Sequence, residues 1–367
     1  MSEELNEITE TSDIPVKVVK KSRVFKVLLI AFAVLAIAGA GIAYYFYDAI
    51  YGSKLNRLTE DLLLQIPSKT DLNGITALLE QKGLLKDKTG FLWVASLMKY
   101  KGKSGQYRVP KNTKSHHALV AVLRREQVPV KLTFNNFRLK DQLAGHVSKY
   151  IEADSLSILS AMNSTDLLDK YGFTAENALT MYIPNSYLIH WDTDAEEFVA
   201  RMYAEYKKFW NKERLELAKK QNLSQIEVYI LASIVDAETT FDPEKPRVSG
   251  VYLNRLRTVG WKLEADPTVV FAGGDFTVRR VTNDLLAINS PYNTYMYPGL
   301  PPGPIRMASV SALEAVLKAE EHDYWFFCAK PPVEGQPAQH AFAKTGAQHG
   351  ANARAYRQWL NSQKIYK

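Results

Sequence analysis

The chain has 367 residues, of which 46% are hydrophobic and 23% charged, so it is long enough for two or three folded domains. The formal net charge of +7 comes without a long basic run, a helix-turn-helix pattern or an RNA-binding signature, so we expect no nucleic-acid partner. A mildly basic protein suits an anionic membrane surface or an anionic polymer instead.

Motifs for metals, cofactors and disulfides are missing from the sequence. The single cysteine, Cys328, cannot form an internal disulfide, and it lies in an apolar run where a thiol is usually inert core. HExxH, CxxC, G-x-G-x-x-G and G-x-S-x-G patterns do not occur, and the histidines lack the spacing of metal ligands. We therefore expect no metal site and no cofactor.

The N-terminal part predicts a membrane anchor. Residues 1–26 are polar and predict a disordered cytoplasmic tail, whereas residues 27–47 are uncharged and almost all apolar. About 20 such residues cross a bilayer as a helix. The basic residues before this segment predict a cytoplasmic N-terminus, with everything after Asp48 outside the cytoplasm. A cleavable signal peptide is the alternative, but its apolar region is typically ~7–15 residues long, which favours a retained anchor.

Residues 52–127 predict a small domain behind a polar connector. Helices are expected at 72–83, at 88–100 and around 119–123, with a short strand at 105–110. Between Lys99 and Lys114 there are six basic residues and no acidic one. This stretch is either a solvated basic face or a surface for lipid headgroups or anionic polymer.

Residues 128–220 predict a connecting region of mixed structure. A strand is expected at 128–134, because apolar and polar residues alternate there, and strand and turn residues occur at 181–187. The helices that we expect in this region span 139–152, 154–161, 164–171 and 195–220.

A helix from Ser224 to about Glu238 carries the candidate catalytic group. On a helical wheel Glu238 falls within the apolar arc and Asp236 falls outside it, so the two acids cannot share a cleft as a pair. A carboxyl group on an apolar face is desolvated, which raises its pKa and keeps it protonated as a general acid requires. The alternative is an ordinary, partly exposed or ion-paired glutamate.

The remaining chain supplies a candidate binding loop. A helix is expected at 247–260, and Asp266-Pro267 indicates a turn that can start another. Residues 290–305 are rich in proline, glycine and tyrosine, which suits a stiff loop that offers ring faces and polar groups to sugars. A packed connecting loop is the alternative, although long ordered loops are usually functional. The final elements that we expect are helices at 309–319 and 351–362 and paired strands at 324–330 and 338–345.

Several motifs resemble those of the YceG-like endolytic murein transglycosylases, in the family's order over roughly the last 140 residues. They are Ala232-Ser-Ile-Val-Asp-Ala-Glu-Thr239, Val251-Tyr-Leu-Asn-Arg-Leu256, Glu264-Ala-Asp-Pro-Thr-Val-Val270, Ser290-Pro-Tyr-Asn-Thr-Tyr295, Gly299-Leu-Pro-Pro-Gly-Pro-Ile305 and His340-Ala-Phe342. In the family the second acid of the first motif is catalytic, and that position is Glu238 here. The sequence departs from the family at Asp236, which is usually glutamate, at Asn185-Ser186, usually Asp-Thr, and at Asn135-Asn136, usually Glu-Gly.

The resemblance implies an α+β protein with a single transmembrane helix, a LysM-like module at 52–127 and a catalytic domain at 221–367. It implies cleavage of the MurNAc-GlcNAc β-1,4 bond within peptidoglycan strands at the outer side of the inner membrane, leaving 1,6-anhydro ends. Partners would be glycan strands and peptidoglycan synthases such as penicillin-binding proteins. The residues that we expect to line the cleft and orient the sugar are Asn254, Asp266, Tyr292, Asn293 and Tyr295.

Three alternatives stay open at this point. A muramidase-type hydrolase needs a second carboxylate, which Asp266 or Glu264 could supply. A non-catalytic peptidoglycan-binding protein, or a scaffold of the wall-synthesis machinery, would tolerate loss of Glu238.

Overall fold

The computed structural model describes residues 23–278 and 281–363, so the tail predicted at 1–26 lies mostly outside the described residues. The chain forms two compact units. The smaller contains residues up to 63 together with 70–103 and 108–125, and the larger contains 64–69, 104–107 and everything from 126 onward. The elements are small two-stranded sheets among many helices, which is the mixed architecture expected from the sequence.

The smaller unit begins with α1 (Arg23–Tyr51), which contains the apolar segment predicted at 27–47. Its 29 residues include a window of mean hydropathy 2.5, so its length and composition are sufficient for a membrane span. The side chains of its predicted span are exposed, as a lipid-facing helix requires.

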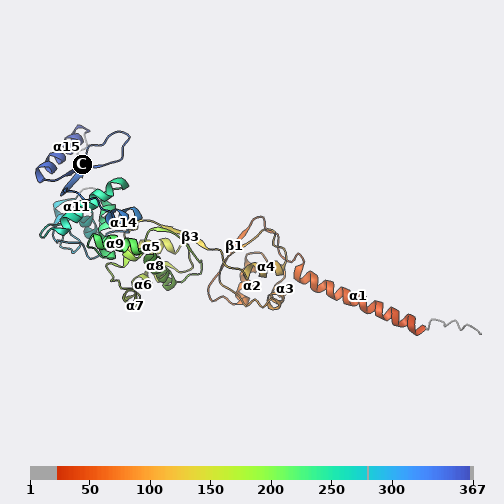
Figure 1. The fold of residues 1–367 in the computed structure, drawn as a ribbon. Helices are drawn as coiled ribbons and strands as arrows, with labels where there is room; N and C mark the ends of the chain where they lie inside the picture. The colour runs from red at the N-terminus through yellow and green to blue at the C-terminus, as the bar shows by residue number, and fades with distance from the viewer. Residues whose placement is uncertain (1–22, 279–280, 364–367) are drawn as a thin grey trace, which may run out of the picture. The chain divides into compact units, whose positions relative to one another are not determined.

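Three further helices of the smaller unit each begin at a residue whose side chain caps the first turn. Asp71, Asp87 and Ser115 each accept a hydrogen bond from the backbone N–H three residues ahead, which satisfies a free donor of the first turn. These caps begin α2 (Leu72–Gln81), α3 (Lys88–Leu97) and α4 (His116–Leu123), which cluster together in Figure 1. Strands β1 (Leu62–Ile66) and β2 (Gly105–Val109) pair with each other.

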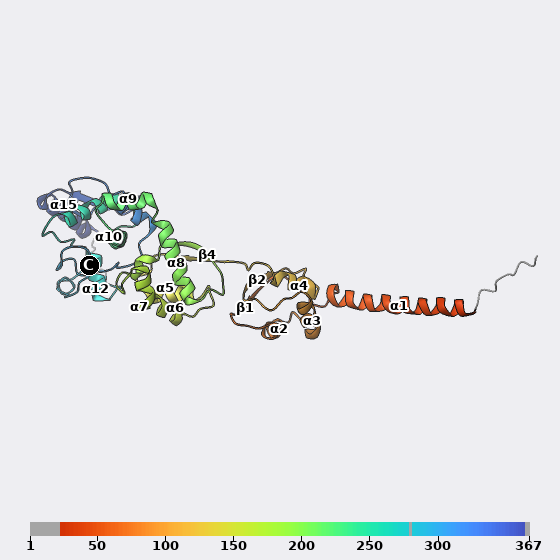
Figure 2. The ribbon, with the colours of Figure 1, turned by 60° about the horizontal axis from the view of Figure 1, so that its bottom comes forward.

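In the larger unit, β3 (Val130–Phe134) and β4 (Asn185–Ile189) form an antiparallel ribbon in which Leu132 faces Tyr187. Helices α5, α6 and α8 gather beside this ribbon in both views (Figures 1 and 2). The elements of this region are α5 (Lys140–Val147), α6 (Ser155–Met162), α7 (Thr165–Tyr171), a 3-10 turn (Ala178–Met181), α8 (Ala195–Phe209) and α9 (Lys212–Lys220).

The prediction of one continuous helix at 195–220 is wrong, because two helices, α8 and α9, occupy this range. Trp210 is buried and leaves the helical conformation, and the Asn211 side chain then accepts from the Arg214 N–H to begin α9. Asparagine competes well for such a cap, whereas the apolar periodicity on both sides hides the break.

The C-terminal part consists mainly of helices that surround α10 (Gln225–Glu238). Its other elements are a 3-10 turn (Asp242–Glu244), α11 (Lys245–Arg257), α12 (Asp266–Gly273), α13 (Asn283–Leu286), α14 (Val310–Leu317), the antiparallel pair β5 (Phe326–Ala329) and β6 (His340–Ala343), and α15 (Gly346–Ser362). Figure 2 places α10 and α12 in the same part of the larger unit.

One hydrophobic core runs through the larger unit, from Leu132 on β3 to Leu317 at the end of α14. Residues predicted as a connecting region at 128–220 therefore share their core with the helix that carries Glu238. This shared packing gives α10 a rigid base, because α10 contacts α9, α11, α12 and α14.

Candidate active site

Helix α10 begins at a reciprocal cap and ends at the candidate acid. Ser224 accepts from the Glu227 N–H at 3.2 Å, and the Glu227 carboxylate accepts from the Ser224 N–H at 2.7 Å. Every residue from Val228 to Asp236 is buried. The helix is therefore enclosed on all sides over this stretch, and Asp236 is buried although it lies outside the apolar arc.

Asp236 belongs to a saturated buried network. It is 6% exposed and forms an ion pair with Lys245, which is 4% exposed, at 2.7 Å. Its carboxylate also accepts from Ser309 Oγ at 2.5 Å and from Asn136 Nδ2 at 3.1 Å. Asn136 and Asp236 both depart from the family pattern, and in this structure they form a hydrogen bond with each other. These contacts bind the start of α11 and the start of α14 to α10.

Glu238, two residues further along α10, lies on the wall of a cavity of 570 Å³. Burial raises the pKa of Glu238 to about 7, a hydrogen bond from Tyr252 opposes that rise, and the nearby charge of Asp266 adds to it. The Tyr252 hydroxyl donates to Glu238 Oε1 at 2.6 Å. The Glu238 carboxyl group is thus partly protonated near neutral pH and held in one orientation by a buried phenol.

Asp266 and Tyr295, two of the residues predicted to line the cleft, lie on the same cavity as Glu238. The Tyr295 hydroxyl donates to Asp266 Oδ1 at 2.5 Å, and burial together with this bond raises the pKa of Tyr295. Asp266 is the first residue of α12, and Tyr295 comes from the proline- and tyrosine-rich loop. The contact therefore joins two of the motifs that are far apart in sequence.

Helix α11 holds the opposite wall in place. Arg255 is buried and donates to the Leu263 carbonyl at 2.7 Å and to the Trp325 carbonyl at 2.8 Å. The backbone at Glu320 packs closely against α11 because residue 250 is glycine. A Cβ at Gly250 would lie 2.3 Å from the Glu320 carbonyl oxygen. These contacts place the β5–β6 hairpin beside Glu238.

A second buried acid orients a histidine on this wall. The Glu244 carboxylate accepts from the His340 backbone N–H at 2.8 Å and lies 2.7 Å from His340 Nδ1. Burial acts to raise the pKa of Glu244, but the hydrogen bonds with His340 outweigh it and the pKa is lowered. His340 lines the cavity of Glu238.

Three of the residues expected in the cleft have other partners. The Asn254 amide donates to the carbonyls of His322 and Tyr324, so it fixes the segment that leads into β5. Asn293 is fully buried and donates to the carbonyls of Leu286 and Ile288 within its own loop. Both amides hold backbone in place.

Tyr292, the third of these residues, packs its ring against Phe271, with ring centroids 4.8 Å apart. This contact packs the proline- and tyrosine-rich loop against α12. Of the five residues expected to orient the sugar, Asp266 and Tyr295 are therefore the two that line the cavity with Glu238.

Sequence reasoning missed several polar residues of this site, although Glu264 was considered as a second carboxylate. Tyr252 and Arg255 appear in the sequence analysis only as members of the motif at 251–256. His340 was noted only within a motif. A polar atom on an otherwise apolar helix face could have indicated these residues. The Tyr252 hydroxyl is an example, because a buried phenol needs a hydrogen-bond partner.

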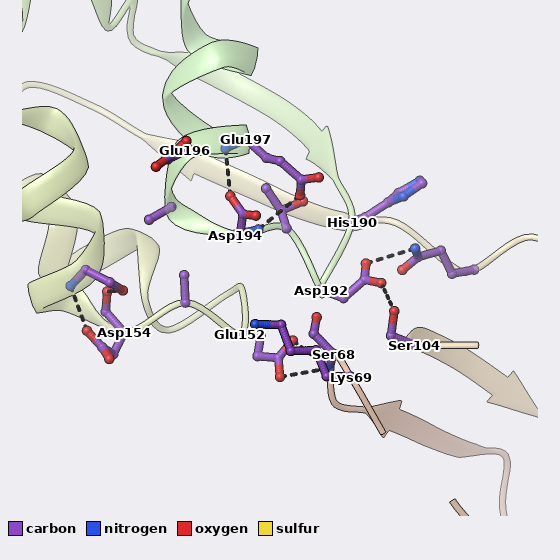
Figure 3. Close-up of a pocket in the computed structure, with 15 residues that line it drawn as sticks. Ser68, Lys69, Ser104, Glu152, Asp154, His190, Asp192, Asp194, Glu196 and Glu197 are labelled. Atoms are coloured by element: carbon purple, nitrogen blue, oxygen red, sulfur yellow. Dashed lines mark hydrogen bonds between the residues drawn. The ribbon is translucent and has the colours of Figure 1, made fainter. Parts of the chain in front are cut away.

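A larger cavity of 810 Å³ in the same unit has a different character (Figure 3). Several of its acids are engaged by the protein: Asp192 accepts from Ser104 Oγ at 2.6 Å, and Glu152 accepts from the Ser68 N–H at 3.0 Å. Asp194 caps the start of α8. These acids hold segments together, so the smaller cavity at Glu238 is the better candidate for chemistry.

A model of the YceG-like family matches residues 64–355. The chain belongs to the YceG-like family. The match includes Glu238 with its whole cavity except Tyr356. A yceG-like protein of Listeria monocytogenes shares the fold: its crystal structure aligns with a TM-score of 0.52 at 24% identity, over 80% of this chain and 99% of that one.

Two relatives of this YceG-like chain carry a functional name. A protein of Bacillus subtilis named endolytic murein transglycosylase is 24% identical over 313 residues, which cover 80% of this chain and 84% of that protein. A Streptococcus pneumoniae protein of the same name is 26% identical over 339 residues, which cover 83% of this chain and 61% of that protein.

Proposed function

We propose that this protein is a lytic transglycosylase that cleaves peptidoglycan strands internally. The observation that carries the proposal is Glu238, a carboxyl group with a pKa near 7 in a cavity, on a chain whose relatives are named endolytic murein transglycosylases. The bond cleaved is the β-1,4 bond from MurNAc to GlcNAc, and the reaction terminates nascent strands.

One carboxyl group is sufficient for both steps of this reaction. Glu238 donates its proton to the glycosidic oxygen as the bond to C1 of the muramyl residue breaks. Its carboxylate then accepts the proton of the 6-hydroxyl of the same residue as that oxygen bonds to C1. The product carries a 1,6-anhydro ring, no water is added, and Glu238 returns to its starting state.

The surrounding residues have supporting roles in this scheme. Tyr252 fixes the orientation of the acid, and the Tyr295–Asp266 pair contacts the sugar from the α12 side of the cavity. The charge of Asp266 keeps the pKa of Glu238 high and stabilises positive charge developing at C1. Asn254, Tyr292 and Asn293 act at a distance by holding the walls.

A muramidase-type hydrolase is the second candidate, and Asp266 is the observation that favours it. Asp266 lies on the same cavity as Glu238, and a hydrolase uses two carboxyl groups across the scissile bond. Asp236 is unsuited to this role because it is buried in its ion pair with Lys245.

We further propose that α1 anchors the protein in the cytoplasmic membrane with its N-terminus inside and the larger unit outside. The length and composition of α1 support the anchor, and murein, the cell-wall polymer in the relatives' names, supports the orientation. The segment 52–127, with its β1-α2-α3-β2 order, is our candidate for the LysM-like module. Peptidoglycan synthases are the proposed partners.

The test is an analysis of products. Full-length protein in detergent is incubated with purified peptidoglycan, beside the Glu238→Gln and Asp266→Asn variants, and the fragments are identified by mass spectrometry. We expect 1,6-anhydro ends from the wild type, and a loss of at least about 100-fold in the Glu238→Gln variant, since the general acid is removed. Asp266→Asn should slow the reaction and leave the product unchanged.

Other outcomes would move the assignment. Reducing ends from the wild type, abolished by either variant, would establish a hydrolase with Asp266 as its second carboxylate. Equal cleavage by wild type and Glu238→Gln would exclude Glu238 as the acid. Absence of cleavage by folded wild-type protein would leave a peptidoglycan-binding or scaffold role.

A further inference from the structure

A separate cavity of 580 Å³ adjoins the candidate active site. It shares Asp266 with the Glu238 cavity, and Ala237, the residue before Glu238, also lines it. Its other walls combine two arginines, Arg138 and Arg306, with apolar side chains. Its apolar walls include Val270, Phe271, Phe276 and Ile305.

The two arginines come from segments far apart in sequence that lie side by side. The Phe137 carbonyl accepts from the Met307 N–H at 2.8 Å, which aligns the backbone beside both arginines. The Arg138 guanidinium lies over the Phe276 ring, 4.6 Å from its centroid. This contact fixes the group on one face and leaves its N–H donors at the edge free to bind a ligand.

The positive charge of this cavity is only partly matched, because two arginines and one acid, Asp266, line it. Within residues 23–278 and 281–363 neither Arg138 nor Arg306 forms an ion pair, and Arg306 Nε is buried without a hydrogen-bond partner. Burial and the charge of Arg306 both lower the pKa of Arg138. Asp266, the acid among the described lining residues, already accepts from Tyr295. A buried donor without a partner is costly, so the site is organised for an incoming anion.

We propose that this cavity binds a carboxylate of the peptide attached to the substrate glycan. Guanidinium groups bind carboxylates through paired hydrogen bonds, and the apolar walls suit short aliphatic side chains. The inference rests on the proposed function, because a peptide-bearing sugar in the Glu238 cavity places its substituent beside the bond that breaks. A phosphate group offers similar anionic oxygens, so the test must separate the two sources.

Binding is measured first, and without catalysis. Full-length Glu238→Gln protein in detergent is titrated by calorimetry with an N-acetylated alanine–glutamate dipeptide, with its diamide and with inorganic phosphate. We expect the dicarboxylate to bind, the diamide to bind at least about tenfold more weakly, and phosphate to compete poorly. Equal binding of dipeptide and diamide, or binding of phosphate alone, would overturn the proposal, and this comparison does not depend on how any arginine variant folds.

Cleavage is measured second. Arg138→Gln and Arg306→Gln are compared with Arg201→Gln, which removes a surface arginine paired with Glu205 on α8. The substrates are glycan strands that carry their peptides and strands from which an amidase has removed them. We expect the two cavity variants to lose roughly 10- to 100-fold in kcat/KM on peptide-bearing strands and little on bare strands, with Arg201→Gln unchanged on both.

Equal losses on both substrates, or no loss on either, would contradict the assignment. If the wild type makes no anhydro ends, the proposed function fails, while the calorimetry still decides whether the cavity recognises a carboxylate.

Discussion

Asp236 and Glu238 stand two residues apart on α10, but they lie in opposite kinds of surroundings. Asp236 is enclosed by an ammonium group, a hydroxyl and an amide that all bind its carboxylate, while Glu238 faces a cavity and accepts a hydrogen bond from the Tyr252 hydroxyl. Burial alone therefore does not make an acid reactive. The difference lies in the partners, because a fully paired carboxylate is structural and a desolvated, sparsely paired one can hold a proton at neutral pH.

Replacing Asp236 should have the largest effect on stability. The Asp236→Asn variant leaves Lys245 buried with only the exposed Asp242 as a charged partner, so we expect a loss of about 3 kcal/mol in the free energy of unfolding. Urea denaturation measures it. Asp323→Asn, at the exposed pair with Lys344, is the matched control and should cost at most about 1 kcal/mol. A similar small loss at both positions would mean that the buried network is not structural.

Replacing Glu238 should change stability in the other direction, and in a pH-dependent way. Its pKa in the folded protein is about 7, above the ordinary value of 4.5, so the wild type loses stability as the pH rises through 7. Glutamine stays neutral, and Glu238→Gln should be more stable than the wild type at pH 8 by up to about 3 kcal/mol, with the difference vanishing below pH 4.5. Denaturation at both pH values measures this; a difference independent of pH would contradict the raised pKa.

Two neighbours of Glu238 should shift the activity profile in opposite directions. The bond from Tyr252 lowers the pKa of Glu238 and the charge of Asp266 raises it. Tyr252→Phe should therefore move the alkaline limb of the kcat profile to higher pH, and Asp266→Asn should move it to lower pH, with rate losses of about tenfold. Shifts in the same direction would show that another group controls this limb.

The smallest effect is expected at Glu244, which acts through His340. Glu244→Gln removes the charge that holds the ring, so we expect kcat to fall by about tenfold or less, with KM nearly unchanged. The nitrogen chemical shifts of His340 provide the second readout, because its tautomer should become mixed. An unchanged tautomer with a large loss of activity would point to a different role for Glu244.

Local chemistry allowed much of this to be predicted from the sequence. Ser224 and the apolar periodicity predict the limits of α10. Two apolar segments separated by a proline- and glycine-rich turn predict the β5–β6 pair. The surroundings of Asp236 could not be predicted, because Lys245, Ser309 and Asn136 converge on it from separate elements. The same limit explains Asn254 and Asn293, whose amides were expected to face sugar and instead meet backbone carbonyls that only the fold brings within reach.

The most direct measurement is the titration of Glu238 itself. Full-length protein labelled with carbon-13 at the glutamate carboxyl groups is followed by NMR from pH 4 to pH 9, and the Glu238→Gln variant identifies the signal. We predict a midpoint near 7 for Glu238. A midpoint near the ordinary value of 4.5 would show that this carboxyl group is ionised at neutral pH, and it would contradict its assignment as the general acid.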